Sequence, residues 1–243
     1  MADADRPAFY ALAPGGWRDY WTLLHPPYTL WHLSYVAIGA TVARAIDLRW
    51  LLETLAAFFL AVGLGAHALD ELKGRPLGTR IPDAVLWTIA AVGVTGAVAF
   101  GVDAAIEATA WVVPFIAVGA FLVVAYDLEA FGGAFHSDAW FAIAWGSFPA
   151  LTSAFAQQRT ITIAAVVVAA ACGAVSFAQR ALSTPVRALR RHAVEVVGEV
   201  RLDDGRREPV NAATLRTPPE TALRWLSIAM PLLAVGLVLS RLR

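Results

Sequence analysis

The hydrophobic pattern of the chain is a succession of apolar stretches, each about twenty residues long, separated by short polar segments. A helix that crosses a bilayer needs about 20 apolar residues, because unpaired backbone groups are too costly in hydrocarbon. The pattern therefore predicts an all-α, polytopic transmembrane helical bundle of about seven spans. The predicted spans cover residues 27–45, 50–70, 83–102, 108–126, 138–157, 160–180 and 223–240.

The composition agrees with this prediction. Of the 243 residues, 58% are hydrophobic and 16% are charged, and the mean hydropathy is +0.61. The apolar stretches are rich in Ala and Gly, which favours close packing of the helices. Basic and acidic residues balance at nineteen each, and no basic run alternates with aromatic residues, so nucleic acid is not an expected partner. The single cysteine, Cys172, excludes an intramolecular disulfide and is expected to be a buried apolar residue.

The basic residues predict the orientation, because cytoplasmic segments carry an excess of Lys and Arg. With the N-terminus in the cytoplasm, the outer side would hold Arg44, Arg49, Arg159, Arg241 and Arg243. The first twenty residues contain charges and no continuous apolar core, so a cleaved signal peptide is not expected. The sequence therefore predicts an integral membrane protein with a cytoplasmic N-terminus. The predicted cytoplasmic side holds Arg6, Arg18, Lys73, Arg75, Arg80, Arg180, Arg187, Arg190, Arg191, Arg201, Arg206, Arg207, Arg216 and Arg224.

One longer polar segment divides the chain into a bundle at 1–180, a cytoplasmic segment at 181–222 and a last transmembrane helix in 223–243. Ser183 or Thr184 followed by Pro185 is typical of a helix start, so an amphipathic helix is predicted there. Alternation around Asp204-Gly205 predicts a tight β-hairpin. The segment is interpreted as a solvated connector or, alternatively, as a cytoplasmic lid or docking element.

Ionisable residues at the ends of the predicted spans gather on the cytoplasmic side. Such residues are costly in a membrane, so their position is informative. Each also has a structural explanation, since Ser137 or Asp138 could cap a helix and His25 could be an interfacial residue. The groups are His25 with His32; His67, Asp70 and Glu71; Tyr126, Asp127 and Glu129; and His136 with Asp138.

This collection of residues favours chemistry on an amphiphilic molecule. Histidines and carboxylates from several helices can hold a divalent metal, and the candidate ligands are His67, Asp70, Asp127, His136 and Asp138. Lys73, Arg75 and Arg80 could bind an anionic head group. His32, Tyr28, Tyr126 and Trp145 are further candidates for substrate binding, because aromatic faces can shelter a cationic intermediate.

Three stretches resemble the UbiA superfamily of membrane prenyltransferases. LLHPPYTLWHLSYVAIGA is similar to the first helix of that family, and YDLEAFGGAFHSDAWFAIAWGSFPALTSAFAQ resembles the glycine-rich helix after its fourth span. GAHALDELKGRPLGTRIP lies where the family has its first acidic motif, with His67, Asp70 and Gly74 at the three acidic positions. The resemblance covers residues 20–158. The second acidic motif has no counterpart here, and the family has nine spans where seven are predicted.

The resemblance implies an isoprenoid substrate and a divalent metal, Mg in that family, whereas histidine at an acidic position would suit Zn or Fe. We therefore predict a membrane enzyme, a UbiA-like prenyl transferase or terpene cyclase, that acts on an isoprenoid or other lipid at the cytoplasmic side. Asp70 or Glu71 would act as an acid, and His67 or His136 would accept a proton. Asp138 would complete the catalytic group.

Other functions remain open at this stage. A Zn or Fe site of histidines and carboxylates could serve a lipid oxygenase or hydrolase. A small-solute transporter is disfavoured by the uncharged stretches within 84–102, 108–126, 139–158 and 160–179, because a proton relay would need titratable groups at mid-bilayer. A purely structural membrane protein is also possible, and the sequence does not predict an oligomeric state.

Overall fold

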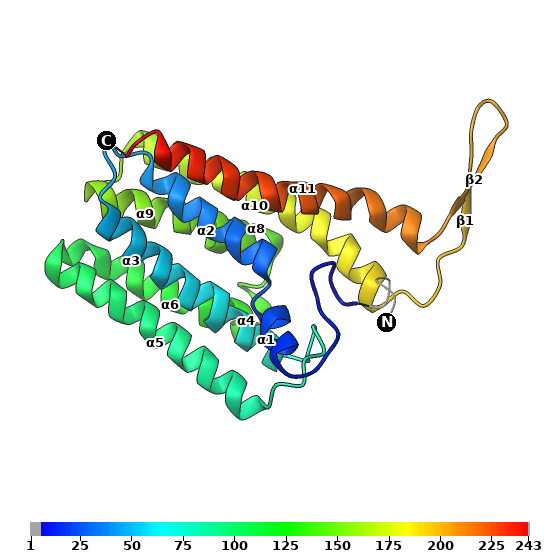
Figure 1. Cartoon of the computed structure of the whole chain (residues 1–243), viewed down its shortest axis with the longest axis horizontal. Coiled ribbons are helices and arrows are strands. Elements are labelled where there is room, and N and C mark those ends of the chain that lie inside the picture. Colours follow the sequence, from blue (N-terminus) through cyan, green and yellow to red (C-terminus); the bar gives the residue numbers. More distant parts are fainter. Residues whose placement is uncertain (1–5, 243) are drawn as a thin grey trace.

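The computed structural model describes residues 6–242, which form a helical bundle with a small β-hairpin (Figure 1). Several helices follow one another without a break, so that α3, η2 and α4 form one rod, η3 and α6 another, and α8, η4 and α9 a third. The short elements are α1 (Trp17–Leu23), α7 (Ala130–Gly133), β1 (Gly198–Arg201) and β2 (Arg207–Val210). The bundle contains α2 (Pro26–Ala40), α3 (Leu48–Phe58), η2 (Phe59–Ala66), α4 (His67–Leu72), α5 (Asp83–Glu107), η3 (Ala110–Val112), α6 (Val113–Asp127), α8 (Asp138–Ala142), η4 (Ile143–Ser147), α9 (Phe148–Gln158), α10 (Ile163–Arg191) and α11 (Ala212–Leu239).

The predicted all-α membrane bundle is confirmed, but the count of seven spans is supported only in part. Within the described residues, five helices are long and apolar enough to cross a membrane: 48–72, 83–107, 110–127, 163–191 and 212–239. The predicted first span is shorter than expected, because α2 has 15 residues, or about 22 Å of helix against a hydrocarbon core of about 30 Å. The predicted fifth span is a helix over residues 138–158 that falls outside this group of five.

Two π-helical segments, η2 and η4, interrupt otherwise α-helical rods. Glycines let neighbouring helices approach η2 and η4 closely. A Cβ atom on Gly93 of α5 would lie 2.5 Å from the carbonyl oxygen of Leu60, and one on Gly146 would lie 2.7 Å from that of Cys172. Such close approach of backbones is typical of helices packed in a membrane.

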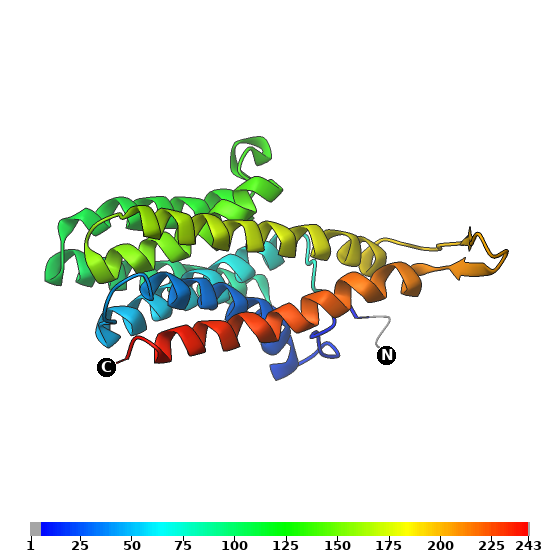
Figure 2. The ribbon, with the colours of Figure 1, turned by 90° about the horizontal axis from the view of Figure 1, so that it is seen from above.

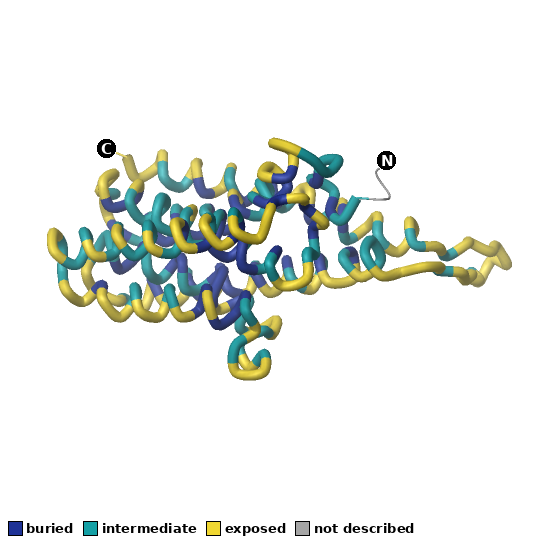
Figure 3. Tube along the Cα trace, turned by 90° about the horizontal axis from the view of Figure 1, so that it is seen from below, coloured by how far each residue is buried: buried dark blue, intermediate teal, exposed yellow. Residues whose placement is uncertain are grey.

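The buried side chains form two apolar clusters, and the outside of the bundle is apolar as well. One cluster includes Val62, Leu86 and Trp145, and the other is centred on Trp31 and Tyr35. Figure 3 shows the buried positions in the interior of the bundle and exposed positions along the hairpin. Large apolar side chains remain exposed on the outer surfaces of the spans, which suits a lipid environment. They include Trp87, Val92, Val167 and Leu232.

The polar segment before the last span is shorter than predicted. The expected helix start at Ser183 or Thr184 is wrong, because α10 continues through Pro185 to Arg191. The hydroxyl groups of Ser183 and Thr184 both donate to the carbonyl oxygen of Arg180, so they bond within the helix instead of capping a new one. The last helix starts at Ala212, where the Asn211 side chain accepts hydrogen bonds from the N–H groups of Ala213 and Thr214.

The predicted hairpin is confirmed. Strands β1 and β2 pair antiparallel, with Gly198 opposite Val210 and Arg201 opposite Arg207. Gly205 has φ 85°, a left-handed conformation that glycine adopts readily. The hairpin projects from one end of the bundle, beyond the ends of α10 and α11 (Figure 2).

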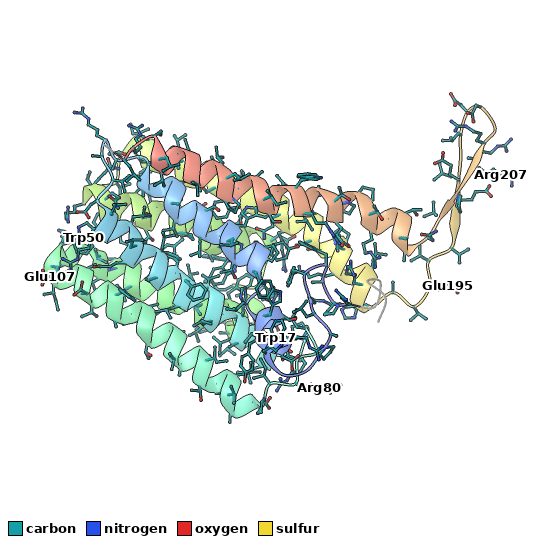
Figure 4. All side chains as sticks on the ribbon, in the orientation of Figure 1. Trp17, Trp50, Arg80, Glu107, Glu195 and Arg207 are labelled. Atoms are coloured by element: carbon teal, nitrogen blue, oxygen red, sulfur yellow. The ribbon has the colours of Figure 1, made fainter. Side chains whose placement is uncertain are left out.

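Labelled residues identify the two ends of the bundle. Trp50 and Glu107 lie at one end, whereas Trp17 and Arg80 lie at the other (Figure 4). The end with Trp17 and Arg80 is also the end from which α10 and α11 continue toward the hairpin, so we refer to it as the hairpin end.

Candidate functional site

Polar side chains from several segments meet inside the hairpin end of the bundle. They come from the N-terminal segment, the residue before α2, helix α4, the end of α6, the loop before α8 and the second half of α10. Their rings stack on one another or their charges lie close enough to interact. The members of this polar cluster are Tyr10, His25, His67, Asp70, Tyr126, His136, Arg187 and Arg191.

Two histidines stack at the centre of the polar cluster. The ring centroids of His25 and His67 are 4.2 Å apart and the planes differ by 19°. The Nδ1 atom of His67 lies 3.3 Å from the carbonyl oxygen of Gly63. A carbonyl oxygen only accepts hydrogen bonds, so Nδ1 carries the proton and Nε2 of the neutral ring keeps its lone pair. His67 therefore presents an unprotonated ring nitrogen.

His25 is held by the turn that starts α2. It precedes Pro26 and has φ 46°, an uncommon left-handed conformation for a residue other than glycine. The Tyr10 hydroxyl lies 2.6 Å from Nδ1 of His25. Burial, with a smaller effect from His67, lowers the pKa of His25 well below its usual value. Burial, followed by the effect of Tyr28, raises the pKa of Tyr10 well above its usual value, so both groups are neutral near pH 7.

Asp70 connects the two sides of the polar cluster. It lies one turn after His67 on α4, and residues three apart share a helix face. Its carboxyl group lies close enough for its charge to interact with Arg191 and Arg187 of α10 and with His136. The segments that the sequence placed together by topology therefore meet in space.

Tyr126 and His136 form the opposite wall. Their rings stack with centroids 4.5 Å apart, and Nδ1 of His136 donates to the Tyr126 carbonyl oxygen at 3.0 Å. In the neutral ring, Nε2 of His136 is then free to accept a proton or a hydrogen bond. Within residues 6–242, neither the Tyr126 hydroxyl nor Oδ2 of the buried Asp127 has a hydrogen-bond partner. Unsatisfied buried polar groups are uncommon, and they are typical of places where a ligand or water binds.

An apolar cavity lies beside this wall. It occupies about 1050 Å³, part of it open to the surroundings, between α3, η2, α5, α6, η4 and α9. Phe58, Phe115 and Phe148 line it, and Trp145 of η4 belongs to the same lining. Trp145 contacts Tyr126 edge to face, with centroids 5.6 Å apart. The cavity therefore adjoins the polar cluster through the contact between Trp145 and Tyr126.

Two predicted substrate-binding residues, His32 and Tyr28, lie next to the polar cluster but are not members of it. His32 is buried, and its Nε2 atom is 3.3 Å from the side-chain oxygen of Gln179. Tyr28 is half-buried and packs edge to face on Phe9 of the N-terminal segment. Tyr28 is close enough to Arg187 for their charges to interact.

Glu71, a predicted catalytic residue, holds a loop instead of facing the polar cluster. Its side chain is fully buried. One carboxylate oxygen accepts from the N–H of Leu77 at 2.9 Å, and the other accepts from the N–H and the hydroxyl of Thr79, both at 2.8 Å. These bonds close the loop that joins α4 to α5.

The predicted anion-binding residues of that loop have protein partners or face outward. Lys73 forms an ion pair with Glu129 at 3.4 Å. Arg75 pairs with Asp83 and donates to the carbonyl oxygen of Ile81 at 2.6 Å. Arg80 is exposed, and its backbone N–H donates to Asp19.

Asp138 also lies outside the polar cluster. It is exposed and accepts a hydrogen bond at 2.8 Å from Arg180, which continues the arginine face of α10. Its helix is capped by Ser137, whose hydroxyl accepts from the N–H of Trp140.

The side chains of the predicted metal site are not grouped as metal ligands. In the described part of the chain, no three His, Cys, Asp or Glu side chains are grouped so that they could hold a metal ion. The proposed ligands His67, Asp70, Asp127, His136 and Asp138 thus do not fit such a site. A divalent metal, whether Mg, Zn or Fe, stays a prediction from the sequence.

Sequence reasoning missed Arg187 and Arg191 as members of the site. Both lie beyond Pro185, where the sequence predicts a separate amphipathic helix at the membrane surface. The signal was their spacing, because Arg180, Arg187 and Arg191 follow at intervals of seven and four on one helix face.

Comparisons with known proteins do not assign the chain to a family. No protein-family model matches it, and the comparisons found no matching curated protein and no matching solved structure.

Proposed function

We propose that the protein is an integral membrane enzyme that acts on an isoprenoid or other lipid, with the polar end of the lipid at the polar cluster. The observation that carries the proposal is the junction of that cluster with the apolar cavity at Tyr126 and Trp145. Ligand sites typically combine an apolar wall with a few convergent polar groups. The resemblance of residues 20–158 to UbiA prenyltransferases favours an isoprenoid, and the arginine distribution favours the cytoplasmic side.

The chemistry assigned to the cluster is proton transfer by its own side chains. Asp70, when protonated, would give a proton to a double bond or epoxide of the lipid, and Nε2 of His67 or His136 would take a proton from the resulting cation. The rings of Tyr126 and Trp145 would shelter that cation. Terpene cyclisation is such a reaction, and a prenyl transfer would use the same cavity and wall.

Lipid retention tests the cavity. Protein purified in a mild detergent should carry a lipid that native mass spectrometry detects. Ala97 lines the cavity on α5, so Ala97→Phe should expel this lipid. The matched control is Ala99→Phe, since Ala99 is exposed on the same helix and does not line the cavity. Loss of the lipid in both variants, or in neither, would contradict the assigned cavity.

Deuterium uptake tests the chemistry. Incubation in D2O with the retained lipid should place deuterium on carbon in the product, because the proton that starts the reaction comes from an exchangeable group. Asp70→Asn should abolish this uptake in folded protein. Asp103→Asn is the control, since Asp103 pairs with Arg49 at the far end of the bundle. Unchanged uptake in Asp70→Asn would sink the proposed role of Asp70.

A further inference from the structure

The arginines of α10 differ in their partners. Arg180 pairs with Asp138 at 2.8 Å, and Arg190 makes a close ion pair with the buried Glu220 at 2.7 Å. Within residues 6–242, no carboxylate lies within 4.0 Å of Arg187 or Arg191. The two side chains are nevertheless half-buried. Two cations one helical turn apart thus face the interior without a paired acid.

Each of these guanidinium groups keeps most of its hydrogen-bonding capacity. Arg187 donates one bond to the Thr184 hydroxyl at 3.3 Å, and Arg191 donates one to the carbonyl oxygen of Pro7 at 3.4 Å. An arginine side chain has five N–H donors in a planar fork that matches a carboxylate or a phosphate. The remaining donors have no acceptor among the described residues.

The surroundings of the two arginines are polar but carry little negative charge. Tyr10, Tyr28 and Tyr126 lie close enough for electrostatic interaction with Arg187, and their hydroxyl groups can donate to an anion. Nε2 of His25 is buried and has no partner within residues 6–242. Asp70 interacts electrostatically with both arginines but forms an ion pair with neither of them. An uncompensated cation inside a membrane protein is costly, which favours binding of an anion there.

We propose that Arg187 and Arg191 bind the phosphate group of a lipid phosphate directly, with no metal ion as a bridge. The inference rests on the proposed function, because it names the head group of the lipid in the apolar cavity. It reassigns anion binding from Lys73, Arg75 and Arg80 to α10, and it agrees with the lack of a grouped set of metal ligands among residues 6–242. The two guanidinium forks and the Tyr28 hydroxyl supply the donors.

Calorimetry on the purified full chain in a neutral detergent with EDTA tests the proposal. Geranyl phosphate should bind, geraniol should bind at least tenfold more weakly, and added Mg²⁺ should leave the affinity for geranyl phosphate unchanged. Arg187→Gln and Arg191→Gln should each weaken geranyl phosphate binding at least tenfold, and Arg187→Lys should recover part of the loss because it keeps the charge. Arg207→Gln, a change in the exposed hairpin, is the control.

Folding is monitored separately. A half-buried arginine without an acidic partner contributes little to stability, so ligand-free Arg187→Gln should unfold at the same temperature as the wild type or higher. Marked destabilisation would show that Arg187 has a structural partner and would count against the proposal. A large loss of affinity in Lys73→Gln would return anion binding to the loop before α5 and would overturn it.

Further measurements distinguish a lipid phosphate from a free anion, and they distinguish failure of the arginine site from failure of the proposed function. Binding of geranyl phosphate without binding of inorganic phosphate identifies a lipid head group, whereas tight binding of inorganic phosphate alone overturns the lipid phosphate in favour of a free anion. Equal binding of geraniol and geranyl phosphate, or a need for Mg²⁺, overturns the arginine site. Lipid retention that depends on Ala97 would still support the proposed function in that case.

Discussion

The carboxylate of Glu71 is the best-defined polar anchor in the chain, since both of its oxygens bond to the loop before α5. Replacing it by glutamine removes the charge and turns an amide N–H₂ toward a backbone donor. Hydrogen bonds to a charged group contribute about 1.5–3 kcal/mol each, so Glu71→Gln should lower the free energy of unfolding by about 2 kcal/mol. Thermal unfolding in detergent measures this change.

The control for Glu71→Gln is Glu129→Gln, which removes an exposed ion pair with Lys73 and should cost less than about 1 kcal/mol. Faster proteolysis within 73–82 is a second expected result. A Glu71→Gln protein of unchanged stability that has lost activity would instead restore the catalytic role predicted from the sequence.

His25 gives the stability a pH dependence with a definite sign. Because burial lowers the pKa of His25 in the folded state, the unfolded chain takes up a proton first, below about pH 6.5. The stability that the neutral ring contributes is therefore complete above that pH and falls as the pH decreases toward the lowered folded pKa. The thermal unfolding midpoint should decrease between pH 7 and pH 5.

His25→Asn should make this slope shallower, since asparagine tolerates the left-handed backbone at position 25 but does not titrate. The control is His192→Asn, since His192 is exposed, and this variant should leave the pH dependence of the unfolding midpoint unchanged. An identical slope in the wild type and in His25→Asn would mean that His25 titrates normally in the folded protein.

At the scale of helices, the hydrophobic pattern predicted the elements well and their ends less well. A helix occurs at each of the seven predicted places, because apolar runs of this length leave no other way to satisfy the backbone. Prediction failed at Pro185, since proline within a helix is tolerated where neighbouring helices support it, and α11 likewise contains Pro218, Pro219 and Pro231. Because the predicted helix ends before Pro185, the prediction did not place Arg187 and Arg191 at the site.

The candidate site was only partly predictable for a related reason. His67 and Asp70 share a helix face, which the spacing predicts. Their partners His25 and His136 come from other segments, and side-chain direction at a turn such as that of His25 depends on a backbone conformation that the hydrophobic pattern does not specify. Glu71 is adjacent to Asp70 in sequence, but its side chain points to the loop before α5 and not to the polar cluster. Adjacent residues on a helix point in different directions, so the position of Glu71 next to Asp70 did not predict this.

The close contact between α5 and η2 predicts a stability effect at Gly93. A methyl group there would lie 2.5 Å from the Leu60 carbonyl oxygen and 2.7 Å from the Gly65 nitrogen, both backbone atoms. Gly93→Ala should therefore destabilise the bundle by about 1–3 kcal/mol. Gly236→Ala is the matched change, because a methyl group at Gly236 meets open space, and it should be neutral or stabilising by up to about 1 kcal/mol. Thermal unfolding of the two variants makes the comparison, and equal midpoints would argue against the α5–η2 contact.

For the whole molecule, the two ends of the bundle carry different numbers of arginines. The hairpin end carries the loop before α5 and the arginine face of α10. Arg49 and Arg159 lie over the ring of Trp50 at the other end. Arg44 lies in the loop before α3, and Arg241 follows α11. The larger number of Lys and Arg residues at the hairpin end favours its location in the cytoplasm. The polar cluster would then open to lipids and protons of the inner leaflet.

Cysteine accessibility tests this orientation. In a Cys172→Ala background, a membrane-impermeant maleimide added to intact cells should label Arg241→Cys, which follows α11, but not Asp203→Cys in the hairpin turn. Permeabilised cells should show labelling of both, which controls for folding and exposure. The opposite pattern would place the polar cluster on the outer side, so the lipid phosphate would have to come from the outer leaflet. Labelling of both positions in intact cells would mean that residues 203 and 241 lie on the same side of the membrane. Because α11 is the one helix between them and is long enough to cross once, this result would show that α11 does not span the membrane.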